Sequence, residues 1–202
     1  ICSQTFAYAV MWEFVATNAA ERALLATNFV RILDHILAHD LYLVDVDGKP
    51  TLWGRWNPEY VNWFPPTIHD RQLNSAELTA SLQLAFAMTG NTRYRDQAYE
   101  MFAKHGYLTN ILSSMKLIAP TEGYVHQGNN MGDEWNHSDD ELSFFTYWPL
   151  VRFAFTADLR AKYLTVVQEH LEIERPERYP IWNFIAAACG ASEFDPAGAV
   201  WT

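Results

Sequence analysis

Residues 73–107 read LNSAELTASLQLAFAMTGNTRYRDQAYEMFAKHGY, and this stretch decides the fold. Apolar side chains recur at the spacing of one helix face in residues 75–88 and again in residues 93–105. Gly90 ends the first predicted helix and Gly106 ends the second, because glycine readily adopts the left-handed conformation that closes a helix. The link between them is only Thr-Gly-Asn-Thr, which predicts a tight antiparallel helical hairpin.

The same organisation continues along the chain. Further helices are predicted at residues 19–41, 109–117, 139–155, 158–172 and 181–188. The link at residues 156–157 is short, so the third and fourth of these also form a tight hairpin. Residues 41–53 instead alternate between apolar and polar side chains around Asp47-Gly48, which predicts a small β-hairpin.

Within each helical hairpin an apolar helix comes first and an amphipathic helix second. Stacking such hairpins places the first helices inside and the second helices outside, with the long connections on one rim. We therefore predict an all-α fold for residues 1–202. It is a single helical domain of stacked antiparallel hairpins with one β-hairpin insertion, and it reads as an excerpt of a larger chain.

Composition narrows the class of protein. Half of the 202 residues are hydrophobic and 19% are charged, which argues against intrinsic disorder. The net charge of −10 and the few, scattered basic residues disfavour a nucleic-acid partner. No apolar run is long enough to predict a membrane span. Cys2 and Cys189 are expected to be free buried thiols, with a disulfide as the alternative. The compartment stays open, and secretion or a periplasmic location is compatible with the sequence.

The hairpin at residues 73–107 resembles the repeating unit of the (α/α) toroid enzymes, the six-hairpin glycosidase-like group. In that group an inner helix, a Thr-Gly turn and an outer helix with a Tyr and an Ala recur. Residues 137–153, HSDDELSFFTYWPLVRF, and residues 174–188, ERPERYPIWNFIAAA, are similar in style. The resemblance implies a partial ring and a carbohydrate substrate. The group contains glycoside hydrolases, sugar epimerases and polysaccharide lyases, so the reaction stays open.

Carboxylates for acid–base chemistry stand at the start of two predicted helices. Asp139 and Asp140 follow His137, and adjacent carboxylates can divide into a protonated acid and an ionised partner. Ser138 and Glu141 are explained by a capping box. Asp70 is the candidate on the opposite wall of the cleft, with an ion pair to Arg71 as its structural alternative.

Two aromatic-rich connections, residues 53–74 and 122–138, are suited to line a sugar cleft, because flat rings stack on sugar faces. A core role is the alternative for Trp182. The charges of residues 174–178 are expected to be solvated ion pairs. The predicted substrate-binding residues are Arg55, Trp56, Arg71, Trp135, Asn136, Tyr147 and Trp182.

The favoured function is a glycoside hydrolase that uses Asp139 or Asp140 with Asp70, and His137 to orient them, on an oligo- or polysaccharide. A polysaccharide lyase using His137 and Tyr147 with Asn136 and Arg71 is one alternative. The other alternative is a non-catalytic helical scaffold or binding domain, whose partners would be the remaining domains of the parent chain. No cofactor is predicted, and no metal site, because His126, His137 and Asp133 lack a dense ligand spacing.

Overall fold

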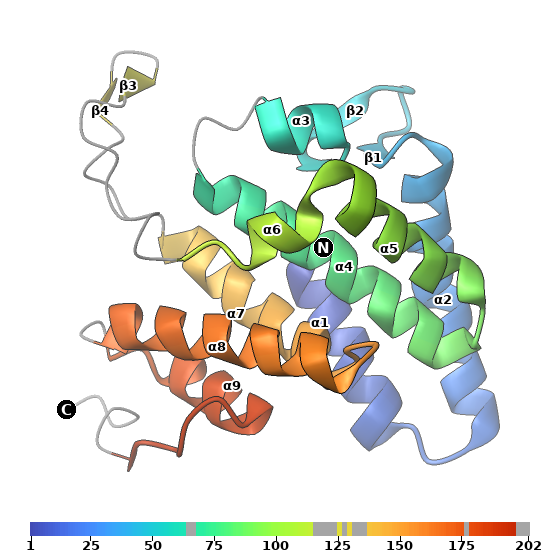
Figure 1. Ribbon diagram of the computed structural model, residues 1–202. Helices are drawn as coiled ribbons and strands as arrows, with labels where there is room; N and C mark the ends of the chain where they lie inside the picture. Colours follow the sequence, from blue (N-terminus) through green and yellow to red (C-terminus); the bar gives the residue numbers. More distant parts are fainter. Residues whose placement is uncertain (64–67, 115–124, 127–128, 131–136, 176–177, 197–202) are drawn as a thin grey trace.

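The computed structural model describes residues 1–63, 68–114, 125–126, 129–130, 137–175 and 178–196, and these residues are mostly helical (Figure 1). The N-terminal part comprises α1 (Cys2–Val10), a π-helical turn (Met11–Val15), α2 (Ala19–Ala38), β1 (Tyr42–Val44), β2 (Pro50–Arg55) and α3 (Pro58–Trp63). The central part comprises α4 (Ile68–Thr89), α5 (Thr92–His105), α6 (Tyr107–Ile111) and the two-residue strands β3 (Val125–His126) and β4 (Asn129–Asn130). The C-terminal part comprises α7 (His137–Arg152), α8 (Ala157–Glu174) and α9 (Pro180–Cys189).

Side-chain caps mark the start of the second helix in each of the two tight hairpins. Asn91 accepts a hydrogen bond from the Arg93 amide (3.2 Å) and caps the start of α5, and Gly106 closes that helix with φ of 71°. In the same way Thr156 accepts from the Leu159 amide (3.1 Å) at the start of α8. The predicted hairpins α4–α5 and α7–α8 are therefore confirmed, and their turns lie at the right of Figure 1.

The apolar helices α1, α4 and α7 run in the same direction and contact one another. Buried side chains join them at matching heights: Thr5 Oγ1 lies 3.1 Å from Ser81 Oγ, and Gln83 Nε2 donates to the Leu150 carbonyl (2.8 Å). α2, α5 and α8 pack outside this trio, and α9 also packs against α7. Each first helix of a hairpin is thus covered by its neighbours, as the apolar pattern predicts.

The core consists of two connected clusters. One fills the space between α7, α8 and α9 and contains Phe144, Tyr163 and Trp182. The other lies between α2, α4 and α5 and contains Phe29, Leu82 and Met101. Phe102, Trp148 and Phe155 pack against both clusters and connect them. Both thiols, Cys2 and Cys189, are buried and free, which confirms that prediction.

The structure corrects two helix boundaries. α4 begins at Ile68 rather than near residue 75, so Asn74, a residue type that often caps helices, lies inside the helix. Glu77, which has the spacing of a capping partner for Asn74, accepts a hydrogen bond from Trp56 Nε1 (2.7 Å). α6 is also shorter than the helix predicted at residues 109–117, whose last three residues lie outside the described part of the chain. Among the described residues, no helix combines the length and apolar character needed to cross a membrane.

The predicted β-hairpin is present: β1 and β2 pair antiparallel around Gly48, which has φ of 79°.

Gly54 of β2 packs closely against β1, because a Cβ on this residue would lie 2.5 Å from Leu43 Cβ. We expect Gly54→Ala to destabilise the protein by about 1–3 kcal/mol through overpacking, as a lower midpoint of urea unfolding. Leu52→Ala is the matched control, since this side chain is exposed on the same strand, and its effect should be small. Equal midpoints for Gly54→Ala and wild type would contradict the close packing of the hairpin.

Candidate functional site

The predicted carboxylates come together at one end of the helix stack. The starts of α4 and α7, which carry Asp70 and Asp139, both lie at the left of Figure 1, together with the last turn of α8. Their proximity also has an electrostatic consequence, because the charge of Asp70 acts on the carboxyl of Asp139. The two helix starts at which the long connections end, those of α4 and α7, therefore lie at a common end of the helix stack.

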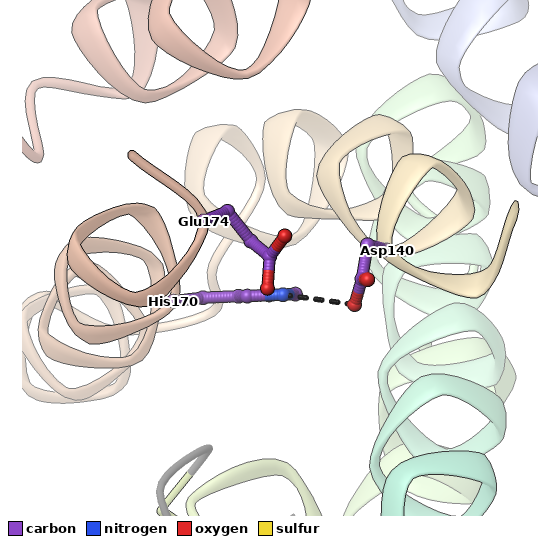
Figure 2. A group of neighbouring side chains, drawn as sticks. All are labelled: Asp140, His170 and Glu174. Atoms are coloured by element: carbon purple, nitrogen blue, oxygen red, sulfur yellow. Dashed lines mark hydrogen bonds and ion pairs between the residues drawn. The ribbon is translucent and has the colours of Figure 1, made fainter. Parts of the chain in front are cut away.

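A group of buried ionisable side chains lies at the same end, between the first turn of α7 and the last turns of α8 (Figure 2). Asp140 of α7 and His170 and Glu174 of α8 are 0%, 0% and 3% exposed. His170 Nε2 lies 3.1 Å from Asp140 Oδ1, and the carboxylate of Glu174 lies against the same imidazole. One ligand atom from each residue can be chosen so that all three lie within 4.8 Å of one another.

Tyr147 holds the other side of the imidazole. Its hydroxyl lies 2.7 Å from His170 Nδ1, and burial, with a smaller contribution from the Asp140 charge, raises the pKa of this phenol well above its ordinary value. A neutral His170 satisfies both contacts if Tyr147 O–H donates to Nδ1 and Nε2–H donates to Asp140. With the other tautomer Nδ1–H donates to the Tyr147 oxygen, and Nε2 then presents a lone pair toward the two carboxylates.

Asp139 differs from its neighbour in exposure and in charge. It is partly exposed, whereas Asp140 is fully buried. Desolvation first, and then the negative charges of Asp70 and Asp140, raise the pKa of Asp139 to about 7. A carboxyl in this range can exist as the neutral acid near neutral pH, as a general acid must.

The predicted stacking aromatics that lie within the described residues, Trp56, Tyr147 and Trp182, are buried. Trp56 and Trp182 are each 3% exposed and Tyr147 is 1% exposed, so packing covers their ring faces. The Trp56 indole is fixed by its hydrogen bond to Glu77, and Trp182 stacks on Phe144 with ring centroids 5.4 Å apart. Trp182 therefore lies in the core, which is the alternative predicted for this residue from the sequence.

Of the predicted polar ligands, Arg55 and Arg71 lie within the described residues. The Arg55 guanidinium lies over the Tyr60 ring (5.5 Å to the centroid) and donates through Nε to the Thr51 carbonyl (2.8 Å). Arg71 follows Asp70 in the first turn of α4 and is partly buried. Trp135 and Asn136 lie outside the described residues; the backbone of His137 begins α7, but its side chain also lies outside them.

His170 and Glu174 are not among the site residues predicted from the sequence, and Glu174 belongs to the charges that the sequence predicts to be solvated ion pairs. That prediction is wrong for Glu174, because this side chain is buried. A signal was present: the two residues stand four positions apart on one helix face, as metal and catalytic side chains often do. This spacing is easily overlooked, because Glu174 is also the first residue of the charged run at residues 174–178.

Two grooves in the described part of the chain lie elsewhere, along α2. One, of about 500 Å³, is lined by Tyr8, His35 and Leu43 among others, and the second, of about 450 Å³, by Trp12, Arg22 and Met88 among others. They hold no cluster of acidic groups, so the chemistry points to the α4–α7–α8 end instead. No protein-family model, curated protein sequence or solved structure matches this chain.

Proposed function

We propose that this chain belongs to a carbohydrate-active enzyme, a glycoside hydrolase with Asp139 as general acid and Asp70 as the ionised partner. The observation that carries the proposal is the convergence of the first turns of α4 and α7, which places these two carboxylates at one end and within electrostatic reach of each other. The parallel course of α1, α4 and α7, with α2, α5 and α8 outside, supports a partial (α/α) ring as the underlying architecture.

In this mechanism Asp139 gives its proton to the glycosidic oxygen while the bond from that oxygen to the anomeric carbon breaks. Asp70 either removes a proton from the attacking water or attacks the anomeric carbon itself, depending on the separation of the two carboxyl groups across the bound sugar. Asp140 is a supporting group in this proposal, since it is buried and bonded to His170. The long connections would supply the sugar contacts.

The test is hydrolysis of a panel of polysaccharides and oligosaccharides, read as new reducing ends. We expect Asp139→Asn and Asp70→Asn each to lower kcat/KM by about 100-fold or more, because removal of a positioned acid or base has effects of this size. Asp158→Asn is the matched control: it removes an exposed aspartate from the first turn of α8, where it pairs with Lys162 (2.8 Å). Its activity should equal that of the wild type.

Three results would overturn the proposal or its choice of catalytic residues. New absorbance from an unsaturated sugar, without hydrolysis, would indicate the lyase. Hydrolysis that is unchanged in both aspartate variants would exclude these carboxylates as the catalytic pair. A folded chain that binds or cleaves no carbohydrate of the panel would favour the non-catalytic scaffold.

A further inference from the structure

We propose that Asp140, His170 and Glu174 bind one divalent transition-metal ion between α7 and α8. Each residue offers one ligand atom, and the three atoms lie within 4.8 Å of one another. His170 and Glu174 are one helical turn apart on α8, so the same face of that helix presents both. Asp140 completes the set from the first turn of α7 (Figure 2). This inference does not depend on the proposed hydrolase.

The separations are close to those of a coordination sphere. Ligand atoms bound at about 2.1 Å from a metal lie roughly 3.0–4.2 Å apart, depending on the angle between the two bonds. No separation here exceeds 4.8 Å, so side-chain rotations that move each atom inward by less than about an ångström would close the set. The present contact of 3.1 Å between His170 Nε2 and Asp140 Oδ1 would be replaced by bonds from both atoms to the metal.

The charge of the site favours a cation. Two carboxylates share a volume from which water is almost excluded, since Asp140 is 0% and Glu174 3% exposed. Buried carboxylates of like charge are costly unless cations or strong hydrogen bonds compensate them. A divalent ion compensates both charges at once and uses the neutral imidazole as its third ligand.

Tyr147 and Gln72 provide a second, independent observation. A metal-bound histidine usually donates its other ring N–H to an oxygen acceptor, and the Tyr147 oxygen stands 2.7 Å from His170 Nδ1. Gln72 of α4 is 1% exposed, and its side-chain amide lies near this hydroxyl. Neither amide atom of Gln72, however, reaches good hydrogen-bond geometry with a described residue. When His170 Nδ1–H donates to the Tyr147 oxygen, the Tyr147 O–H no longer donates to His170. It can then donate a hydrogen bond to the side-chain carbonyl of Gln72, which gives that buried oxygen a partner.

The ligand chemistry indicates the class of metal. One imidazole nitrogen and two carboxylate oxygens suit Zn²⁺, Mn²⁺ or Fe²⁺ better than Ca²⁺ or Mg²⁺, which prefer oxygen ligands alone. Three protein ligands would leave a further position for water or for a substrate oxygen.

The experiment measures Zn²⁺ binding to the purified chain after EDTA treatment and dialysis, by isothermal titration and by metal analysis of the dialysed protein. We expect one Zn²⁺ per chain. His170→Asn and Glu174→Gln should each weaken the affinity by about 100-fold or more, and Tyr147→Phe by about 10-fold through the loss of the second-sphere oxygen. Glu172→Gln is the matched control, since Glu172 lies on the same helix but is exposed and paired with Arg175 (2.6 Å). It should bind Zn²⁺ like the wild type.

A surface site must be distinguished from the buried one. His35 and His39 lie one turn apart on α2 with ring centroids 4.2 Å apart, so they could also bind Zn²⁺. The His35→Gln background removes this pair, and all variants are measured in it. Absence of Zn²⁺ binding in that background would overturn the proposal, and so would equal binding by His170→Asn and the parent. Should circular dichroism show that His170→Asn is unfolded, Tyr147→Phe decides: an unchanged affinity overturns the site and a weakened one supports it.

Discussion

Phe144→Ala is expected to lower the free energy of unfolding by about 3–5 kcal/mol, one of the largest effects of a single substitution in this chain. Phe144 is 0% exposed and stands in the cluster between α7, α8 and α9. Its ring stacks on Trp182, meets Tyr147 edge-on with centroids 5.4 Å apart and lies 4.8 Å from the His170 ring. Truncation would remove these contacts together and leave a cavity beside the buried polar group.

The measurement is urea unfolding followed by circular dichroism, with the slope of the transition checked for a two-state change. Phe184→Ala is the control, because Phe184 lies on α9 but is 55% exposed. Its effect should be about 1 kcal/mol or less, since little apolar area leaves the interior. Equal losses in the two variants would show that α7 is not packed against α9 as described.

Asp139→Asn, unlike Phe144→Ala, should raise the free energy of unfolding, and it should do so in the metal-free protein above neutral pH. The folded pKa of Asp139, about 7, stands above the ordinary value of 3.8. The stability contributed by its protonated form is therefore fully present below pH 3.8 and is lost as the pH rises through about 7. Asparagine imitates the neutral acid at every pH. After a discount for partial exposure, the gain at pH 8 should be about 1–2 kcal/mol, and the gain at pH 4 should be close to zero.

Asp158→Asn is the matched control for this second prediction. Both aspartates lie in the first turn of a helix, where a negative charge gains about 0.3–1 kcal/mol from the helix dipole. At Asp158 this gain and the pair with Lys162 dominate, so its loss should destabilise slightly. At Asp139 desolvation and the charges of Asp70 and Asp140 outweigh the dipole. Thermal unfolding with EDTA at pH 4 and pH 8 measures both variants, and a pH-independent difference for Asp139→Asn would contradict the assigned cause.

The helical hairpins could be predicted because their signals are local. Gly90 and Gly106 both have positive φ, so each ends its helix for a reason that is visible in a few neighbouring residues. The carboxylates of α7 were predicted for the same reason, since Asp139 and Asp140 directly precede an apolar run. The extra turns at the start of α4 were missed because Asn74 and Glu77 imitate a cap.

The surroundings of individual side chains could not be predicted in the same way. Trp56 stands in a polar segment and looked available to a ligand, but it is buried because Glu77, 21 residues later, accepts its indole N–H. His170 reads as part of an amphipathic helix, and only its contact with Asp140, 30 residues earlier, makes it part of a site. Partners of this kind are fixed by how helices pack, and helical periodicity alone does not specify which helices meet.

The parallel arrangement of α4 and α7 also has a consequence for how the chain folds. Each hairpin closes over a turn of a few residues, whereas Gln83 and Leu150, which join the two helices, are 67 residues apart. Local contacts form quickly and long loops close slowly, so the hairpins should form first and dock afterwards. Asp70 belongs to the first hairpin and Asp139, Asp140 and His170 to the second, so the acidic end would be assembled only at the docking step, after most of the helical structure is in place.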